Sequence, residues 1–116
     1  MIAFVLVAAG GTLGAGVRYL LATQWSARFP WSILVANLAG SFGLGLLLGT
    51  ASPGLLLFAG VGFCGALTTF STFALDTLVL AREGRVAASA VNVAVSVAGS
   101  ITALVAGLAL ARSLGF

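Results

Sequence analysis

Residues 60–73 read GVGFCGALTTFSTF, and this stretch decides the fold of the chain. It lies inside a long apolar run, and in it three glycines are followed by four hydroxyl residues. Glycine weakens a helix, and backbone groups that are freed inside a membrane must find other partners. We therefore predict a membrane-spanning helix that breaks between Gly65 and Thr69, as helices do where they line a cavity or hold an ion. Composition alone leaves an alternative open, an unbroken helix with a small-residue packing face.

The composition of the whole chain places it in a membrane. Of its 116 residues 61% are hydrophobic, and the mean hydropathy is +1.25. Charged residues make up only 6%, namely five arginines, one aspartate and one glutamate. A soluble domain carries about a quarter charged residues. Seven charges are too few to cover the surface of a soluble protein of this length.

The same composition excludes several classes of function. Histidine is absent and Cys64 is the only cysteine, so there is no disulfide framework, no Cys/His metal cluster and no histidine base. No acid/base pair is visible, and we predict that the chain is not an enzyme. The sequence pI is about 10.6, but the arginines are spread along the chain without a basic patch, so nucleic acid is not an expected partner.

Four segments are long and apolar enough to cross a bilayer, which takes about 20 apolar residues. They form a single domain over residues 1–116, with spans at about 3–23, 31–49, 54–80 and 86–111. Ser52 and Pro53 are typical of the first residues of a helix, and they begin the third span. The polar residues 82–85, REGR, end it. The first apolar run has no basic residues before it, which argues against a cleaved signal peptide.

The orientation of the spans is weakly specified. Arg28, Arg82 and Arg85 lie on one side of the membrane, and Arg112 lies on the other side with the N-terminus. The positive-inside rule would place both termini outside. The bias rests on few charges, however, and Glu83 lies within the more basic side. Insertion in both orientations therefore remains open.

Polar residues inside the spans require an explanation, because they are expensive in a membrane. Asn37 and Ser41 share one face of the second span. A stripe of polar residues follows one face of the fourth span: Ser89, Asn92, Ser96 and Ser100. Such stripes are either interhelical hydrogen bonds, worth about 1 kcal/mol each, or a lining that replaces water around a permeating solute.

Three stretches resemble the signatures of the CrcB/Fluc family of fluoride channels. Residues 10–19, GGTLGAGVRY, are similar to the first-helix signature, and residues 37–42, NLAGSF, to the second-helix motif. Residues 62–73 resemble the third-helix signature almost throughout, and this motif is highly specific. Two positions depart from the usual residues of the family, since Ala66 replaces a common glycine and Asp76 stands where members often have glutamate. The resemblance covers nearly the whole chain.

The resemblance implies a passive fluoride-selective channel that exports fluoride across the cell (inner) membrane. It implies an antiparallel, dual-topology homodimer with two pores and a structural sodium ion at its centre. The sodium would be held by the backbone carbonyls of Gly65 and Thr68 from each subunit, and Arg18 would lie in the vestibule. The implied fluoride-contacting residues, by motif position, are Phe70, Phe73, Asn37, Ser71, Thr72, Ser96 and Ser100.

Two other membrane functions compete with a fluoride channel. Small multidrug transporters also have about four spans and form antiparallel dimers, but they rely on a glutamate in the first helix. Residues 3–23 contain no glutamate. A structural membrane subunit without transport would explain the small-residue packing but not the third-helix motif. A proton-coupled transporter would need a buried carboxylate, and Asp76, the one acid inside a span, lies near the end of its helix.

Overall fold

A computed structural model describes residues 1–24, 29–50 and 52–115, and the regular elements in these ranges are all helices. They are α1 (Ile2–Gln24), α2 (Trp31–Thr50), α3 (Pro53–Leu55), η1 (Leu56–Cys64), α4 (Gly65–Leu67), α5 (Phe70–Arg82) and α6 (Val86–Ser113). Four helical segments of the described chain are long and apolar enough to span a membrane: Ile2–Gln24, Trp31–Gly49, Pro53–Arg82 and Val86–Ser113. The predicted all-α membrane fold with four spans is thereby confirmed. Arg28, which entered the charge count, lies outside the described residues.

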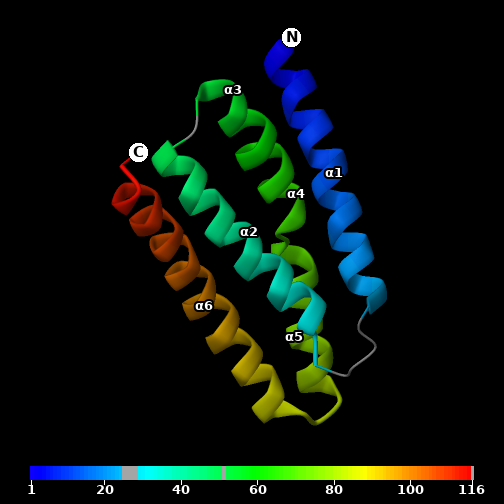
Figure 1. The fold of residues 1–116 in the computed structure, drawn as a ribbon. Coiled ribbons are helices and arrows are strands. Elements are labelled where there is room, and N and C mark those ends of the chain that lie inside the picture. Colours follow the sequence, from blue (N-terminus) through cyan, green and yellow to red (C-terminus); the bar gives the residue numbers. More distant parts are fainter. Residues whose placement is uncertain (25–28, 51, 116) are drawn as a thin grey trace.

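The third span is assembled from four helical pieces. Ser52 caps its start, because the Ser52 hydroxyl accepts from the N–H of Leu55 at 3.5 Å, and Pro53 takes the first helical position as predicted. The next piece, η1, is a π-helix of nine residues. Long π-helices are rare, and short ones are frequent at functional sites. α4 completes the half of the span before the break, which is uppermost in Figure 1, and α5 forms the half after it.

The predicted break is present and falls on two threonines. Thr68 (φ −80°, ψ 153°) and Thr69 (φ −152°, ψ 127°) are extended, whereas Gly65 (φ −61°, ψ −39°) remains helical. The freedom of glycine is therefore not used at Gly65. β-branched threonine tolerates extended backbone well, and its hydroxyl can bond nearby backbone groups. The hydroxyl of Thr69 caps α5 by accepting from the N–H of Thr72 at 3.3 Å.

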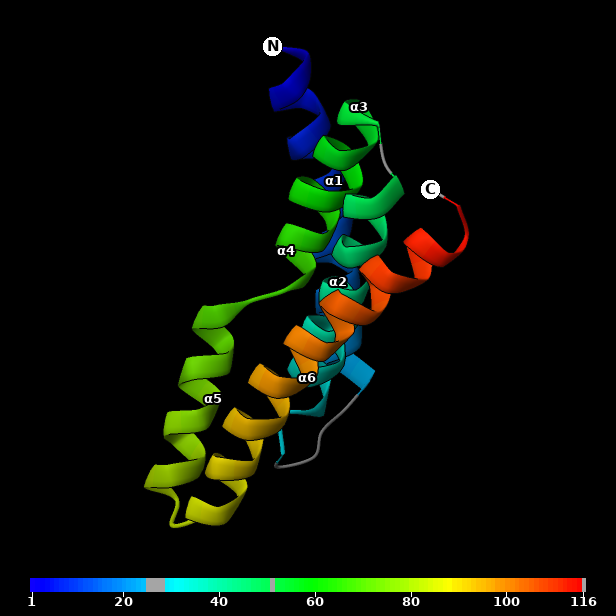
Figure 2. The same cartoon turned by 90° about the vertical axis from the view of Figure 1, so that its left-hand side faces the viewer.

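The helices form two close pairs that meet in the middle of the molecule (Figure 1). α2 runs along α6, and α1 runs along η1. Glycines allow both approaches, since a Cβ on Gly10 would collide with the carbonyl of Phe58, and one on Gly107 would collide with the carbonyl of Phe42. This agrees with the small-residue packing that is common between membrane helices. Below the break, α5 leaves the other helices and packs mainly on α6, as Figure 2 shows.

Candidate functional site

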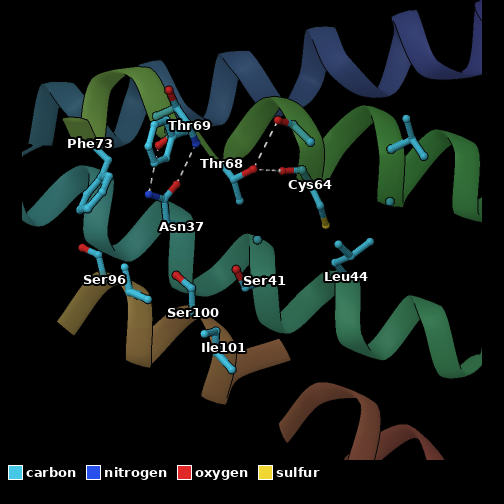
Figure 3. A pocket seen from close by; sticks show the side chains of 16 residues that line it. Asn37, Ser41, Leu44, Cys64, Thr68, Thr69, Phe73, Ser96, Ser100 and Ile101 are labelled. Carbon is cyan, nitrogen blue, oxygen red and sulfur yellow. Dashed lines mark hydrogen bonds between the residues drawn. The ribbon is translucent and has the colours of Figure 1, made fainter. Parts of the chain in front are cut away.

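A hollow of about 750 Å³ lies beside the helix break. α2, η1, α4, α5 and α6 all contribute to its walls, together with the two extended threonines. Figure 3 shows the side chains that line it. Its lining contains seven of the ten predicted site residues: Asn37, Gly65, Thr68, Phe70, Phe73, Ser96 and Ser100. The structure thus gathers residues from three different spans around one space.

Three predicted site residues do not line this hollow. Ser71 is exposed on α5, and Thr72 lies in the first turn of that helix beside the hydroxyl of Thr69. Arg18 lies on α1, which contributes no lining residue. The expected contact of Ser71 and Thr72 with the ion remains a prediction, and so does a vestibule around Arg18.

Asn37, on α2, pairs backbone groups that the break leaves without helical partners. Its Oδ1 accepts from the N–H of Thr69 at 2.8 Å, and its Nδ2 donates to the C=O of Thr69 at 3.2 Å. Both backbone groups of an extended membrane residue are thereby paired by one side chain (Figure 3). Asn37 lines the hollow, and its amide group has a second N–H that is not used at the break. The side chain can therefore hold the break and still offer a donor.

Arg18 reaches the break from the other side. Its Nε donates to the C=O of Ala66 at 3.0 Å. This carbonyl belongs to the last turn of α4, where a helix carries partial negative charge. A guanidinium in that place pairs a freed carbonyl and complements the charge of the helix end. The sequence did not indicate this contact, because nothing in the spacing of Arg18 and Ala66 brings them together.

The carbonyls of Gly65 and Thr68 both lose their helical N–H donors at the break. The Thr68 hydroxyl donates to the C=O of Cys64 at 3.0 Å and lies 3.4 Å from the C=O of Gly65. The N–H of Thr69, which would serve Gly65 in a continuous helix, goes to Asn37 instead. The N–H of Thr72 goes to the hydroxyl of Thr69, and no described residue donates to the C=O of Thr68. These two oxygens are thus suited to a hard cation.

Phe70 and Phe73 form the aromatic part of the lining. Their ring centroids lie 5.8 Å apart with the ring planes tilted by 52°. The Phe70 side chain is 78% exposed, although it lies in the first turn of a helix at mid-span. An aromatic ring carries partial positive charge at its edge, so tilted rings can present polarised C–H groups without a formal cation. Their arrangement adds weak donors to the amide and hydroxyl groups of the lining.

Ser41 belongs to the polar face of the second span, but the sequence assigns it no role, and no sequence pattern identifies Thr69 and Ala66 as backbone partners. Ser41 lines the hollow one turn from Asn37. The signal for Thr69 is present in principle, because backbone groups freed by a break in a membrane helix must find other partners, and a polar side chain on a neighbouring helix is one of them. Asn37 is the amide side chain of the second span. What the sequence lacked was the register between the two helices.

Comparison with known proteins places this chain in a family. Residues 5–108 match the family described as CrcB-like protein, Camphor Resistance (CrcB). A "Fluoride-specific ion channel FluC" of Chelativorans sp. (strain BNC1) is 44% identical, covering 94% of this chain and 95% of the relative. A protein of the same name from Agrobacterium fabrum is 42% identical over 98% of this chain and 99% of the relative. "Fluoride-specific ion channel FluC 1" of Nocardia farcinica is 46% identical, over 90% and 78%. The chain belongs to the CrcB-like family, which is the family that its three motifs resemble.

Proposed function

We propose that this protein is a passive, fluoride-selective channel of the cell inner membrane that lets fluoride leave the cytoplasm. Relatives that share more than two fifths of its residues are named fluoride-specific ion channels. The observation that carries the proposal is the hollow, which combines an amide, hydroxyls and two aromatic rings inside a membrane span. A channel makes and breaks no covalent bonds, in agreement with the prediction that the chain is not an enzyme.

The chemistry of the lining suits an anion that must shed its water. Fluoride is small and strongly hydrated, so a pore must replace its hydration shell with close hydrogen-bond donors. Asn37, Ser96 and Ser100 offer N–H and O–H groups, and Phe70 and Phe73 offer ring edges. None of these groups is a full cation. Binding is therefore weak enough for release, which conduction requires.

The proposed assembly is an antiparallel homodimer with two pores. Phe70 lies in the middle of a span and is 78% exposed, and the lining of the hollow reaches the surface of the single chain there. A second copy, inverted in the membrane, would cover this face and complete the walls. Each pore would then be built from both subunits. The weak arginine bias across the membrane permits insertion in either orientation.

The proposed structural ion is sodium, held at the dimer centre by Gly65 and Thr68. Their carbonyl oxygens have lost their helical partners, and carbonyl oxygen is a ligand that hard cations prefer. Two carbonyls from each subunit would converge on the twofold axis. A cation there relieves the repulsion between them and supplies only charge. The residues of the chain hold the break, orient the rings and present the donors.

Liposomes that contain the purified protein test the function directly. Potassium fluoride or potassium chloride is loaded inside, valinomycin is added to balance charge, and efflux is recorded with ion-selective electrodes. We expect rapid fluoride efflux without ATP or a sodium gradient, and chloride efflux at the rate of protein-free liposomes. Equal rates for the two anions would overturn the proposal. Efflux that needs an imposed proton gradient would instead favour a coupled transporter.

A further inference from the structure

A chain of hydrogen bonds joins α5 to α6 below the hollow. The Nδ2 of Asn92 donates to the Oγ1 of Thr77 at 2.9 Å, and that Oγ1 donates to the C=O of Phe73 at 2.8 Å. Ser89 adds a third bond, from its Oγ to the C=O of Thr77 at 2.9 Å. Asn92 is 1% exposed, which makes it the largest fully buried side chain of the described protein. We call these three bonds, together with a fourth from the Ser96 hydroxyl to Asn92, the Thr77–Asn92 network.

The network ends on two residues that line the hollow. At one end it reaches the backbone of Phe73, and at the other the Oγ of Ser96 donates to the Oδ1 of Asn92 at 3.3 Å. The direction of the bonds is fixed. The hydroxyl of Thr77 donates its one proton to the C=O of Phe73, so its oxygen can only accept from Asn92. The amide nitrogen of Asn92 therefore faces Thr77, and its amide oxygen faces Ser96.

The placement of α5 depends on this contact with α6. The extended Thr68 and Thr69 separate α5 from the upper half of its own span, and α5 touches α2 only slightly. Figure 2 shows α5 lying beside α6 and apart from the remaining helices. Because Phe70 and Phe73 are carried by α5, any shift between α5 and α6 would move both rings relative to Ser96.

The network also controls the proton of Ser96. A serine hydroxyl has one proton, and in this structure it is directed to Asn92 and not into the hollow. An anion at Ser96 must therefore compete with the amide oxygen for that proton. Such competition weakens binding at the site, and weak binding is what rapid passage needs.

We propose that Thr77 and Asn92 are positioning residues for the anion path. They fix the spacing between the Phe73 ring and the Ser96 hydroxyl. They also keep the Ser96 O–H directed at Asn92 until an anion competes for that hydrogen bond. Neither residue lines the hollow, so both act through others. The inference deepens the proposed fluoride conduction and rests on it, and the test therefore includes a readout that does not depend on flux.

Thr77→Val is the decisive variant, because it keeps the shape of the side chain and removes the hydroxyl. We expect fluoride efflux to slow about tenfold, because the variant loses the interhelical hydrogen bond from Asn92 and the bond to the C=O of Phe73. Amide hydrogen exchange over residues 70–82 should become faster, since α5 is held less firmly. Thr77→Ser, which keeps the hydroxyl, should restore both properties. Asn92→Leu should resemble Thr77→Val if the purified dimer is retained.

Thr12→Val is the matched control. Thr12 donates to the C=O of Ala8 at 2.8 Å, the same bond that Thr77 makes to Phe73, but it is exposed on α1 and has no second partner among the described residues. Its loss should change neither efflux nor exchange. Wild-type efflux in Thr77→Val would overturn the inference, even with faster exchange. If the wild-type protein carried no fluoride, the proposed function would fail, while faster exchange confined to residues 70–82 would still support the placement of α5.

Discussion

The side-chain amide of Asn37 pairs with both backbone groups of Thr69, accepting from its N–H at 2.8 Å and donating to its C=O at 3.2 Å. One side chain on α2 thus does for an extended residue what two helical neighbours do elsewhere. The pairing fixes α2 to the break at the depth where Phe70 and the hollow lie. A residue that the motif assigns to the ion path is therefore also a support for the backbone around that path.

Asn37→Asp keeps an acceptor oxygen on the side chain and removes both amide N–H donors. The carboxylate still accepts from the N–H of Thr69, but it cannot donate to the C=O, and it adds negative charge beside the hollow. We expect fluoride efflux to fall by more than about tenfold, because the charge repels the anion and the donors are lost. Liposome efflux measures the effect, and gel filtration checks the assembly. Wild-type efflux in a correctly assembled variant would show that the side chain does not face the ion.

Phe70→Ile and Phe73→Ile remove the polarised ring edge and keep apolar bulk. The rings lie at the hollow with centroids 5.8 Å apart, and aliphatic side chains offer no partial positive charge there. We expect much slower fluoride efflux from each variant. Phe4→Ile is the control, because Phe4 is 76% exposed on α1 and does not line the hollow. Normal efflux in both Phe70→Ile and Phe73→Ile would reduce the rings to packing.

Arg18→Met tests the guanidinium behind the break. The C=O of Ala66 would lose its donor inside the membrane, at a cost of about 1–3 kcal/mol in the free energy of unfolding. Thermal unfolding in detergent should show a lower midpoint. Arg18→Lys keeps the charge and should recover part of the loss. Arg112→Met is the control, since Arg112 is exposed in the last turn of α6 and should cost less. Equal losses at positions 18 and 112 would remove the special role of Arg18.

Much of this architecture follows from the sequence, and the rest depends on helix register. Long apolar runs between polar turns are sufficient to predict four spans, and Ser52 with Pro53 predicts where the third begins. The glycines and hydroxyls of residues 60–73 predict a break but not its exact residues, because the decisive bonds come from Asn37 on another helix. No sequence pattern indicates a role for Thr77. Its partners lie on α6, and their meeting is set by the packing of two helices, which local periodicity does not encode.

Gly10→Ala should disrupt the packing of α1 on η1. A Cβ at Gly10 would meet the carbonyl of Phe58, which is backbone and cannot turn away. We expect a lower unfolding midpoint and poor recovery of the protein from membranes. Gly16→Ala is the control on the same helix, because no atom lies within 4 Å of a Cβ placed there. Alanine at that position should be neutral or stabilise α1 by up to about 1 kcal/mol. Equal behaviour of the two variants would argue against tight packing at Gly10.

Antiparallel assembly predicts that the loop between α5 and α6 is found on both sides of the membrane. Glu83 is exposed in this loop, so Glu83→Cys in a Cys64→Ala background gives a single accessible thiol. An impermeant maleimide, applied to intact and then to opened spheroplasts, should label two comparable populations. A membrane-permeable maleimide applied to a third sample sets the total. This measurement reports orientation independently of flux.

The same labelling bears on the sodium site, because the proposed cage is built from inverted subunits. When two copies pair antiparallel, their breaks meet at mid-membrane on the twofold axis, where the carbonyls of Gly65 and Thr68 from each copy can converge. Since those ligands are backbone atoms, Thr68→Ser should leave efflux within about twofold of wild type, as it retains the hydroxyl that donates to Cys64. Labelling from one side alone would defeat the dual topology. It would also defeat the symmetric carbonyl cage, whatever the efflux of Thr68→Ser.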